Sequence, residues 1–258
     1  MDLPTFAIES KTCMSVNNRG TDKEYNHLYL SCVYGPLFEQ FRPVKKLLEI
    51  GIGGGCSAEL WSKYLTPDLI IAIDTDKNFY EHLKNRQLPN VKLMFGDAYS
   101  RAIHRLLPKD LDIVIDDGPH AYWSLKAAAR IFLSKLRSGG VIVIEDIPSI
   151  EKVKTKLLLS ADSKLVCCFW LFDLRTEARL SDDSVALLIH KTGSACNFHF
   201  ERGQKIYKPT LFKSLLIKQI LIFERGSDFL IRKIYHGIKF RVAALSRLLV
   251  RMSKIRPN

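Results

Sequence analysis

Short apolar runs alternate with helix-like segments between residues 47 and 146, and this alternation constrains the fold more than any other feature. The strand-like runs are 47–51, 69–74, 91–97, 111–118 and 141–146, and the clearest helix-like segments are 56–65, 77–86 and 122–136. This β-α-β-α order predicts a parallel sheet with right-handed crossovers. Two further runs, 165–174 and 184–191, predict a closing antiparallel pair. The predicted fold class is α/β, a doubly wound seven-stranded sheet with an antiparallel last strand.

A glycine-rich turn, LLEIGIGGGCSAELW, joins the first strand-like run to the first helix-like segment. Glycine lets a ligand approach the backbone, and ligands of doubly wound sheets bind outside the carboxyl ends of the strands. A dinucleotide site would place a glycine where Cys56 stands. Glu49 would repel a diphosphate and suits a positively charged ligand such as S-adenosylmethionine, and Asp74 can accept hydrogen bonds from both ribose hydroxyls. The alternative interpretation of the glycine run is a tight turn that binds no ligand.

The predicted S-adenosylmethionine site draws on several strand ends. It comprises Glu49, Gly51, Gly53, Gly55, Asp74, Asp97 and Asp116. Asp97 would lie near the adenine, although a role as the cap of the helix-like segment AYSRAIHRLL explains it equally well. Asp76 is predicted to cap the helix-like segment that follows it.

Four carboxylates follow two neighbouring strand-like runs, in LDIVIDDGPH (111–120) and VIVIED (141–146). Adjacent strands lie about 4.8 Å apart, so these carboxylates should converge, and they cannot all stay ionised there without a cation. The pattern predicts a site for Mg²⁺, with solvated loop acids and helix caps as the alternative. His120 follows Asp117 across Gly118-Pro119, and its ordinary pKa of about 6.5 suits a general base, whereas a surface or capping histidine is the alternative.

Six segments occur in an order that is similar to a known enzyme family. They are GTDKEYNHLY, LLEIGIGGG, IAIDTDK, GDAYS, DIVIDDGPH and SGGVIVIEDI. Over roughly residues 18–192 the chain resembles the macrocin and mycinamicin type of macrolide deoxysugar O-methyltransferases. These belong to the class I S-adenosylmethionine-dependent methyltransferases, which have a Rossmann-like sheet. Pro119 departs from the family, which has a small polar residue before the histidine, and is expected to stiffen the turn.

The resemblance implies a reaction and a set of site residues. Asp117, Glu145 and Asp146 would bind Mg²⁺, and His120 would be the catalytic base. The reaction would methylate a sugar hydroxyl of a glycoside or cell-surface glycan, with Mg²⁺ binding neighbouring hydroxyls and lowering the pKa of the attacking one. An N-terminal motif would lie near the active site without assigned individual roles: Thr21, Asp22, Lys23, His27 and Tyr29.

Positive charge is concentrated at the C-terminal end. Residues 205–258 contain 13 Lys and Arg and only two acids, whereas the rest of the chain is nearly neutral. We expect an N-terminal segment covering the active site (1–40), a methyltransferase domain (41–192) and a basic amphipathic helical extension (193–258). One interpretation packs the extension on the body or on a second subunit of a homo-oligomer, and another places it on an anionic membrane. Its many Leu and Ile residues disfavour nucleic acid.

The expected location is cytoplasmic, or peripheral on the inner face of the membrane, where a lipid-linked glycan could serve as the acceptor. MDLPTFAIES lacks the basic and apolar runs of a signal peptide, and no run of about 18 apolar residues predicts a transmembrane helix. Six cysteines without a CxxC pair predict reduced thiols. Two alternatives to this enzyme remain: a non-catalytic donor-binding protein on the same scaffold, and a nucleic-acid methyltransferase.

Overall fold

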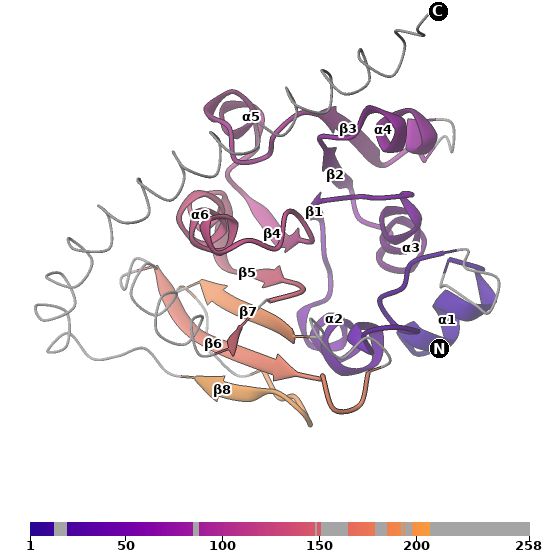
Figure 1. The fold of residues 1–258 in the computed structure, drawn as a ribbon, viewed down its shortest axis with the longest axis vertical. Coiled ribbons are helices and arrows are strands. Elements are labelled where there is room, and N and C mark those ends of the chain that lie inside the picture. The colour runs from indigo at the N-terminus through magenta and orange to yellow at the C-terminus, as the bar shows by residue number, and fades with distance from the viewer. Residues whose placement is uncertain are drawn as a thin grey trace, which may run out of the picture. The chain divides into compact units, whose positions relative to one another are not determined.

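Within the described residues, an eight-stranded sheet with the order β3-β2-β1-β4-β5-β7-β6-β8 forms the centre of the unit 1–208 (Figure 1). The computed structural model describes residues 1–12, 20–84, 88–147, 149–150, 165–178, 185–191, 193 and 198–206. The strands are β1 (Lys46–Ile50), β2 (Leu69–Asp74), β3 (Val91–Phe95), β4 (Leu111–Asp116), β5 (Leu136–Ile144), β6 (Val166–Asp173), β7 (Val185–Lys191) and β8 (Gln204–Ile206). The chain divides into residues 1–208 and 209–258. The second unit, with most of the predicted helical extension, lies outside the described residues.

The directions of the strands confirm the predicted doubly wound sheet. β3, β2, β1, β4 and β5 are parallel neighbours, and β7 runs antiparallel between β5 and β6. The sheet has one strand more than the seven that we predicted, because β8 pairs antiparallel with β6. A three-residue strand carries no recognisable periodicity of its own, and it forms here because the edge of β6 offers unpaired backbone groups. The sheet therefore extends into the segment that we had assigned to the extension.

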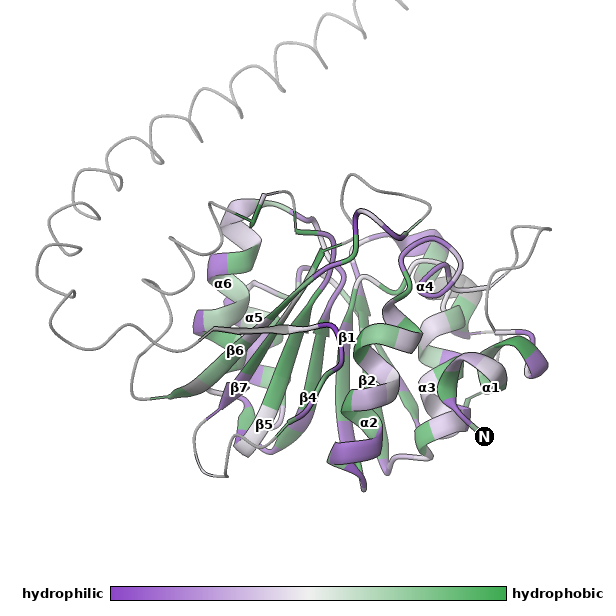
Figure 2. Ribbon diagram, turned by 90° about the horizontal axis from the view of Figure 1, so that it is seen from below, coloured by the Kyte–Doolittle hydropathy of each residue, from purple (hydrophilic) through white to green (hydrophobic). Residues whose placement is uncertain are grey.

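Helices cover both faces of the sheet, which explains why its strands are largely apolar. All six residues of β4 are buried. α1 (Leu3–Glu9), the π-helix η1 (Leu30–Tyr34), α2 (Gly35–Phe41) and α3 (Cys56–Leu65) pack on one face. α5 (Arg101–Leu106) and α6 (Tyr122–Phe132) pack on the other, and α4 (Lys77–Lys84) lies beside β2 and β3. Figure 2 shows apolar residues concentrated on the strands between these layers.

Most helix and strand boundaries agree with the sequence pattern. α3 and β2 have the predicted bounds, and Asp76 caps α4, with its Oδ1 accepting a hydrogen bond from the Asn78 amide at 2.7 Å. Ser100, and not Asp97, caps α5, because its Oγ accepts from the Ile103 amide at 3.3 Å. α6 ends at Phe132, before the predicted end at residue 136, because β5 already begins at Leu136.

Two further expectations concern the cysteines and the membrane. Cys168 is disulfide-bonded, which contradicts the expectation of reduced thiols at this position, whereas Cys32 and Cys56 have reduced thiols as expected. Among the helices within the described ranges, none has both the length and the apolar character that crossing a membrane requires.

Candidate active site

A pocket of about 620 Å³ lies at the carboxyl ends of β1 to β4, the edge at which doubly wound sheets bind ligands. The glycine-rich turn lines it through Gly51 and Gly53, whose φ angles are 78° and 46°. A Cβ on Gly51 would lie 1.9 Å from the Asp117 carbonyl oxygen, so only glycine allows this turn to approach the end of β4. Gly55 lies outside the pocket, where it caps α3 and packs against Leu83.

Asp74 and Asp97 line the pocket at the ends of β2 and β3. Asp74 Oδ2 accepts a hydrogen bond from the Ile52 amide at 3.0 Å, and its Oδ1 accepts from the Asp76 amide at 2.7 Å. Asp97 Oδ1 accepts from the Tyr99 amide at 2.9 Å. A carboxylate can accept about four hydrogen bonds, so both side chains retain capacity for the hydroxyl or amino groups of a ligand.

Aromatic side chains supply the apolar wall of the pocket. Phe79, Tyr99 and Trp123 line it, and the rings of Tyr99 and Trp123 meet edge to face with centroids 5.3 Å apart. The Tyr99 hydroxyl donates to Asp116 Oδ1 at 2.5 Å. This bond anchors the wall to the end of β4. A flat, apolar ring system such as adenine suits a wall of this kind.

Glu49 and Asp116 are buried beside the pocket and do not line it. Glu49 Oε1 accepts a hydrogen bond from Trp61 Nε1 at 3.2 Å. Within the described part of the chain, Glu49 Oε2 and Asp116 Oδ2 have no hydrogen-bond partner. Burial raises the pKa of Glu49 to about 7, against the attraction of Lys23, and burial raises the pKa of Asp116 to about 6. Two buried carboxyl groups beside the glycine turn, each with one oxygen that lacks a hydrogen-bond partner within the described residues, suit a cationic ligand such as a sulfonium compound.

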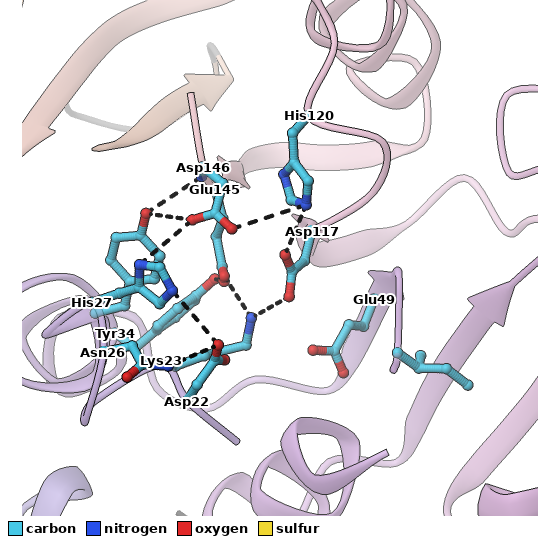
Figure 3. A network of polar contacts seen from close by, with 12 residues as sticks. Asp22, Lys23, Asn26, His27, Tyr34, Glu49, Asp117, His120, Glu145 and Asp146 are labelled. Carbon is cyan, nitrogen blue, oxygen red and sulfur yellow. Dashed lines mark hydrogen bonds and ion pairs between the residues drawn. The ribbon is translucent and has the colours of Figure 1, made fainter. Parts of the chain in front are cut away.

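Asp117, His120 and Asp146 face one another at the ends of β4 and β5 (Figure 3). His120 Nε2 lies 3.8 Å from Asp117 Oδ1 and 3.9 Å from Asp146 Oδ2. His120 and Asp146 both have left-handed backbone conformations, with φ angles of 48° and 51°. Such conformations are unfavourable for residues other than glycine and tend to cluster at functional sites. The structure therefore brings together three of the residues that the sequence placed at these strand ends, namely Asp117, His120 and Asp146.

The N-terminal motif reaches this cluster through Lys23, whose side chain is only 2% exposed. Lys23 Nζ donates to Asp117 Oδ2 at 2.7 Å and to Glu145 Oε2 at 2.5 Å. The Tyr34 hydroxyl donates to the other oxygen of Glu145. Burial acts to lower the pKa of Lys23, but the charges of Asp117, Glu145 and Glu49 outweigh it and raise that pKa well above its usual value. Lys23 is therefore a charged, buried ammonium group.

Two aromatic residues of the same segment hold Asp146. The Tyr29 hydroxyl donates to Asp146 Oδ1 at 2.8 Å, and His27 stacks on the Tyr29 ring with centroids 5.2 Å apart. His27 lies 3.6 Å from Asp22 and 3.9 Å from Asp146. Thr21 is also buried, and its amide donates to the Thr12 carbonyl at 2.7 Å. The N-terminal motif therefore belongs to the packing of the acid cluster.

The donor atoms of this cluster fit a hard divalent ion. One ligand atom each from Asp117, His120 and Asp146 lies within 4.8 Å of the others, and carboxylate oxygens are the ligands that Mg²⁺ prefers. Burial raises the pKa of Asp146, and the charge of Asp117 adds to this effect, so the cluster favours a cation. Glu145 lies deeper, with both oxygens already accepting hydrogen bonds. To bind the same ion, it would have to turn or to use its remaining lone pairs.

Sequence reasoning missed three residues of this site, Tyr34, Tyr99 and Trp123. Tyr99 lies in the GDAYS segment that was already noted, and Trp123 follows His120 by three residues, so both carried a local signal. Tyr34 carried none, because it lies in an apolar helix and is 111 residues from its partner Glu145. Lys23 was noted only as part of a motif, without its contacts.

The strand order of the sheet, with a pocket at the carboxyl ends of its parallel strands, is that of the Rossmann-like methyltransferase fold. Residues 48–147 match a protein family described as a methyltransferase domain. Several relatives confirm the predicted resemblance to the macrocin and mycinamicin type of sugar O-methyltransferases.

Two curated relatives illustrate the similarity. An 8-demethyl-8-alpha-L-rhamnosyl tetracenomycin-C 2'-O-methyltransferase from Streptomyces olivaceus is 31% identical over 140 residues, which cover 50% of this chain and 35% of that protein. Mycinamicin VI 2''-O-methyltransferase from Micromonospora griseorubida is 32% identical over 111 residues, covering 39% of this chain and 27% of that protein. The matched segment thus spans about a third of the length of these relatives.

Solved structures support the fold. MycE methyltransferase in complex with Mg, SAH and mycinamycin VI has a TM-score of 0.53 and 19% identity, covering 85% of this chain and 59% of that one. A putative rRNA-methylase from Clostridium thermocellum has a TM-score of 0.52 and 14% identity, covering 66% of this chain and 98% of that one. At these identities the likeness concerns the fold alone.

Proposed function

We propose that the chain is an S-adenosylmethionine-dependent O-methyltransferase that uses Mg²⁺ and acts on a sugar hydroxyl of a glycoside or glycan. The position of Asp117 carries this proposal. Asp117 lines the pocket, and it also belongs to the cluster with His120 and Asp146. A methyl group held in the pocket would therefore lie beside an acceptor held at the cluster. The relatives named for methylation of a rhamnosyl tetracenomycin and of mycinamicin VI support a sugar acceptor.

Different residues would bind the donor and the metal ion in the proposed reaction. Gly51 and Gly53 admit the donor, and Asp74 accepts hydrogen bonds from it. Asp117 and Asp146 would hold Mg²⁺, with Glu145 as a third ligand if it turns. When bound, Mg²⁺ would lower the pKa of a sugar hydroxyl by direct charge stabilisation.

His120 is the base of the proposed reaction. Its side chain is 39% exposed, and so it is open to an acceptor, and its Nε2 lies 3.8 Å from Asp117 Oδ1 and 3.9 Å from Asp146 Oδ2. The sugar oxygen gives its proton to Nε2 and attacks the methyl carbon of the donor in line, so that a C–O bond forms while the S–CH3 bond breaks and S-adenosylhomocysteine leaves. Positioning supplies much of the rate.

Methyl transfer to rhamnosylated acceptors, followed by mass spectrometry with Mg²⁺ or with EDTA, tests this function. Turnover should require Mg²⁺, and H120A should lose at least about 100-fold in turnover. H120A should bind S-adenosylhomocysteine as the wild type does, because His120 does not line the pocket. H104A, at a half-buried histidine of α5, is the matched control.

Three outcomes would contradict the proposal. Turnover that is unchanged in EDTA would remove Mg²⁺ from the mechanism, and full activity of H120A would remove the histidine. Donor binding without methyl transfer to any sugar acceptor would favour the non-catalytic donor-binding protein.

We also propose that residues 205–258 contact an anionic membrane, where a lipid-linked glycan would be the acceptor. The segment combines 13 Lys and Arg with many Leu and Ile residues, the composition of an interfacial segment. The full chain should float with liposomes that contain anionic lipid and much less with neutral ones. A chain that ends at residue 208 should not float. Equal behaviour of the two chains on anionic liposomes would contradict membrane contact.

A further inference from the structure

Lys23 brings a positive charge into the centre of the acid cluster, and the reaction described above gives it no part. Its ammonium group bridges Asp117 and Glu145, at 2.7 Å and 2.5 Å, and the side chains of Lys23 and Glu145 are buried, whereas that of Asp117 is partly exposed. The Glu49 carboxyl group also lies nearby (Figure 3). A lysine is rarely buried unless it is paired, so this placement requires an explanation.

Lys23 divides the oxygens of the cluster into two sets. Asp117 Oδ2 and Glu145 Oε2 face the ammonium group. Asp117 Oδ1 and Asp146 Oδ2 instead face His120, at 3.8 Å and 3.9 Å from its Nε2. An ion held by Asp117 and Asp146 would therefore share the Asp117 carboxylate with Lys23, one cation on each oxygen.

We propose that Lys23 is a positioning residue that acts as a built-in counter-ion of the acid cluster. It keeps Asp117 and Glu145 in place before a divalent ion binds, and it weakens the binding of that ion by sharing Asp117 with it. The first effect follows because unpaired buried carboxylates repel one another and are costly to bury. The second follows because two cations near one carboxylate repel each other. The inference rests on the proposed function only in the expectation that a divalent ion binds there.

The substitution K23M tests this inference, because methionine retains an unbranched side chain and removes the charge. K135M is the matched control. Lys135 is also buried, but its Nζ donates to the Leu107 carbonyl at 2.8 Å and not to an acid. Thermal unfolding of the full chain would be followed in EDTA and through a Mg²⁺ titration, without donor or acceptor, so that the readout does not depend on turnover.

K23M should lower the Tm in EDTA by roughly 10 °C. Mg²⁺ should then raise the Tm of K23M more than that of the wild type, with an apparent Kd roughly tenfold smaller. K135M should respond to Mg²⁺ as the wild type does. Adding E145Q to K23M should restore most of the lost Tm in EDTA, because the unpaired carboxylate is then neutral. If K23M does not fold, the Mg²⁺ titrations of K23M/E145Q and E145Q make the same comparison.

The possible failures are distinguishable. Equal Mg²⁺ titrations of K23M and the wild type would overturn the inference and leave the metal site of the proposed function intact. Absence of a Mg²⁺ response in both proteins would overturn the inference together with the metal requirement. A K23M/E145Q protein that is no more stable than K23M would overturn the counter-ion role by itself.

Discussion

Replacing Gly51 by alanine tests the close approach of the glycine turn to Asp117, the residue that the pocket and the acid cluster share. The added Cβ would lie 1.9 Å from the Asp117 carbonyl oxygen and 3.2 Å from the Gly118 Cα, and Gly51 has a φ of 78°. Because carbon atoms pack at about 3.5–4.0 Å, the end of β4 would have to move by more than about 1 Å. Overpacking costs about 1–3 kcal/mol and a left-handed alanine about 1–2 kcal/mol more. We therefore expect G51A to lose about 2–5 kcal/mol of unfolding free energy.

Urea unfolding of the donor-free protein measures this loss, and calorimetry with S-adenosylhomocysteine measures the effect on the pocket. G54A is the matched control, because no atom lies within 4 Å of a Cβ at Gly54 and its φ is not left-handed. G54A should therefore unfold within about 0.5 kcal/mol of the wild type. Since Asp117 would move with the strand end, G51A should also lose roughly 100-fold in turnover. A G51A protein as stable as G54A would refute the view that close approach of β1 and β4 requires this glycine.

Three further predictions follow from the buried acids and the aromatic wall. Y99F removes the hydrogen bond from Tyr99 to Asp116 Oδ1, in a buried carboxyl group whose Oδ2 has no partner within the described residues. Urea unfolding should therefore show a loss of about 1–3 kcal/mol of unfolding free energy. An unchanged free energy would mean that water replaces the hydroxyl. Because burial raises the pKa of Glu49 from 4.5 to about 7, the folded protein favours the protonated form of this side chain. Its contribution to the free energy of unfolding is therefore fully present below pH 4.5, and about 3 kcal/mol is lost as the pH rises through about 7. E49Q should therefore be less sensitive to pH than the wild type in urea unfolding between pH 5 and pH 8, and parallel curves would contradict the assignment. W123A removes a half-exposed wall residue and should raise the Kd for S-adenosylhomocysteine roughly tenfold with little change in Tm; unchanged affinity would place the adenine elsewhere.

Local patterns predicted most of the fold because they reflect local physics. The bounds of α3 and β2 follow from apolar periodicity over a few residues and from the turn signals beside them. The short strand β8 was not predictable, since its only support is the edge of β6, more than 30 residues earlier in the chain. The assignment of the α5 cap to Ser100 was also open, because Asp97 and Ser100 are both good capping residues and only the backbone geometry selects one.

The sequence by itself determined which residues stand at the carboxyl ends of the strands, and hence that Asp74, Asp117 and Asp146 share one edge of the sheet. The tertiary structure decided which way each acid points. Successive residues of a strand face opposite sides, so Ile50 lines the pocket while the adjacent Glu49 is buried against Trp61. The tertiary structure also brought Lys23 to Asp117 and Glu145, which lie 94 and 122 residues away. No local pattern encodes such pairs, because their distance depends on how the whole sheet and its N-terminal helices pack.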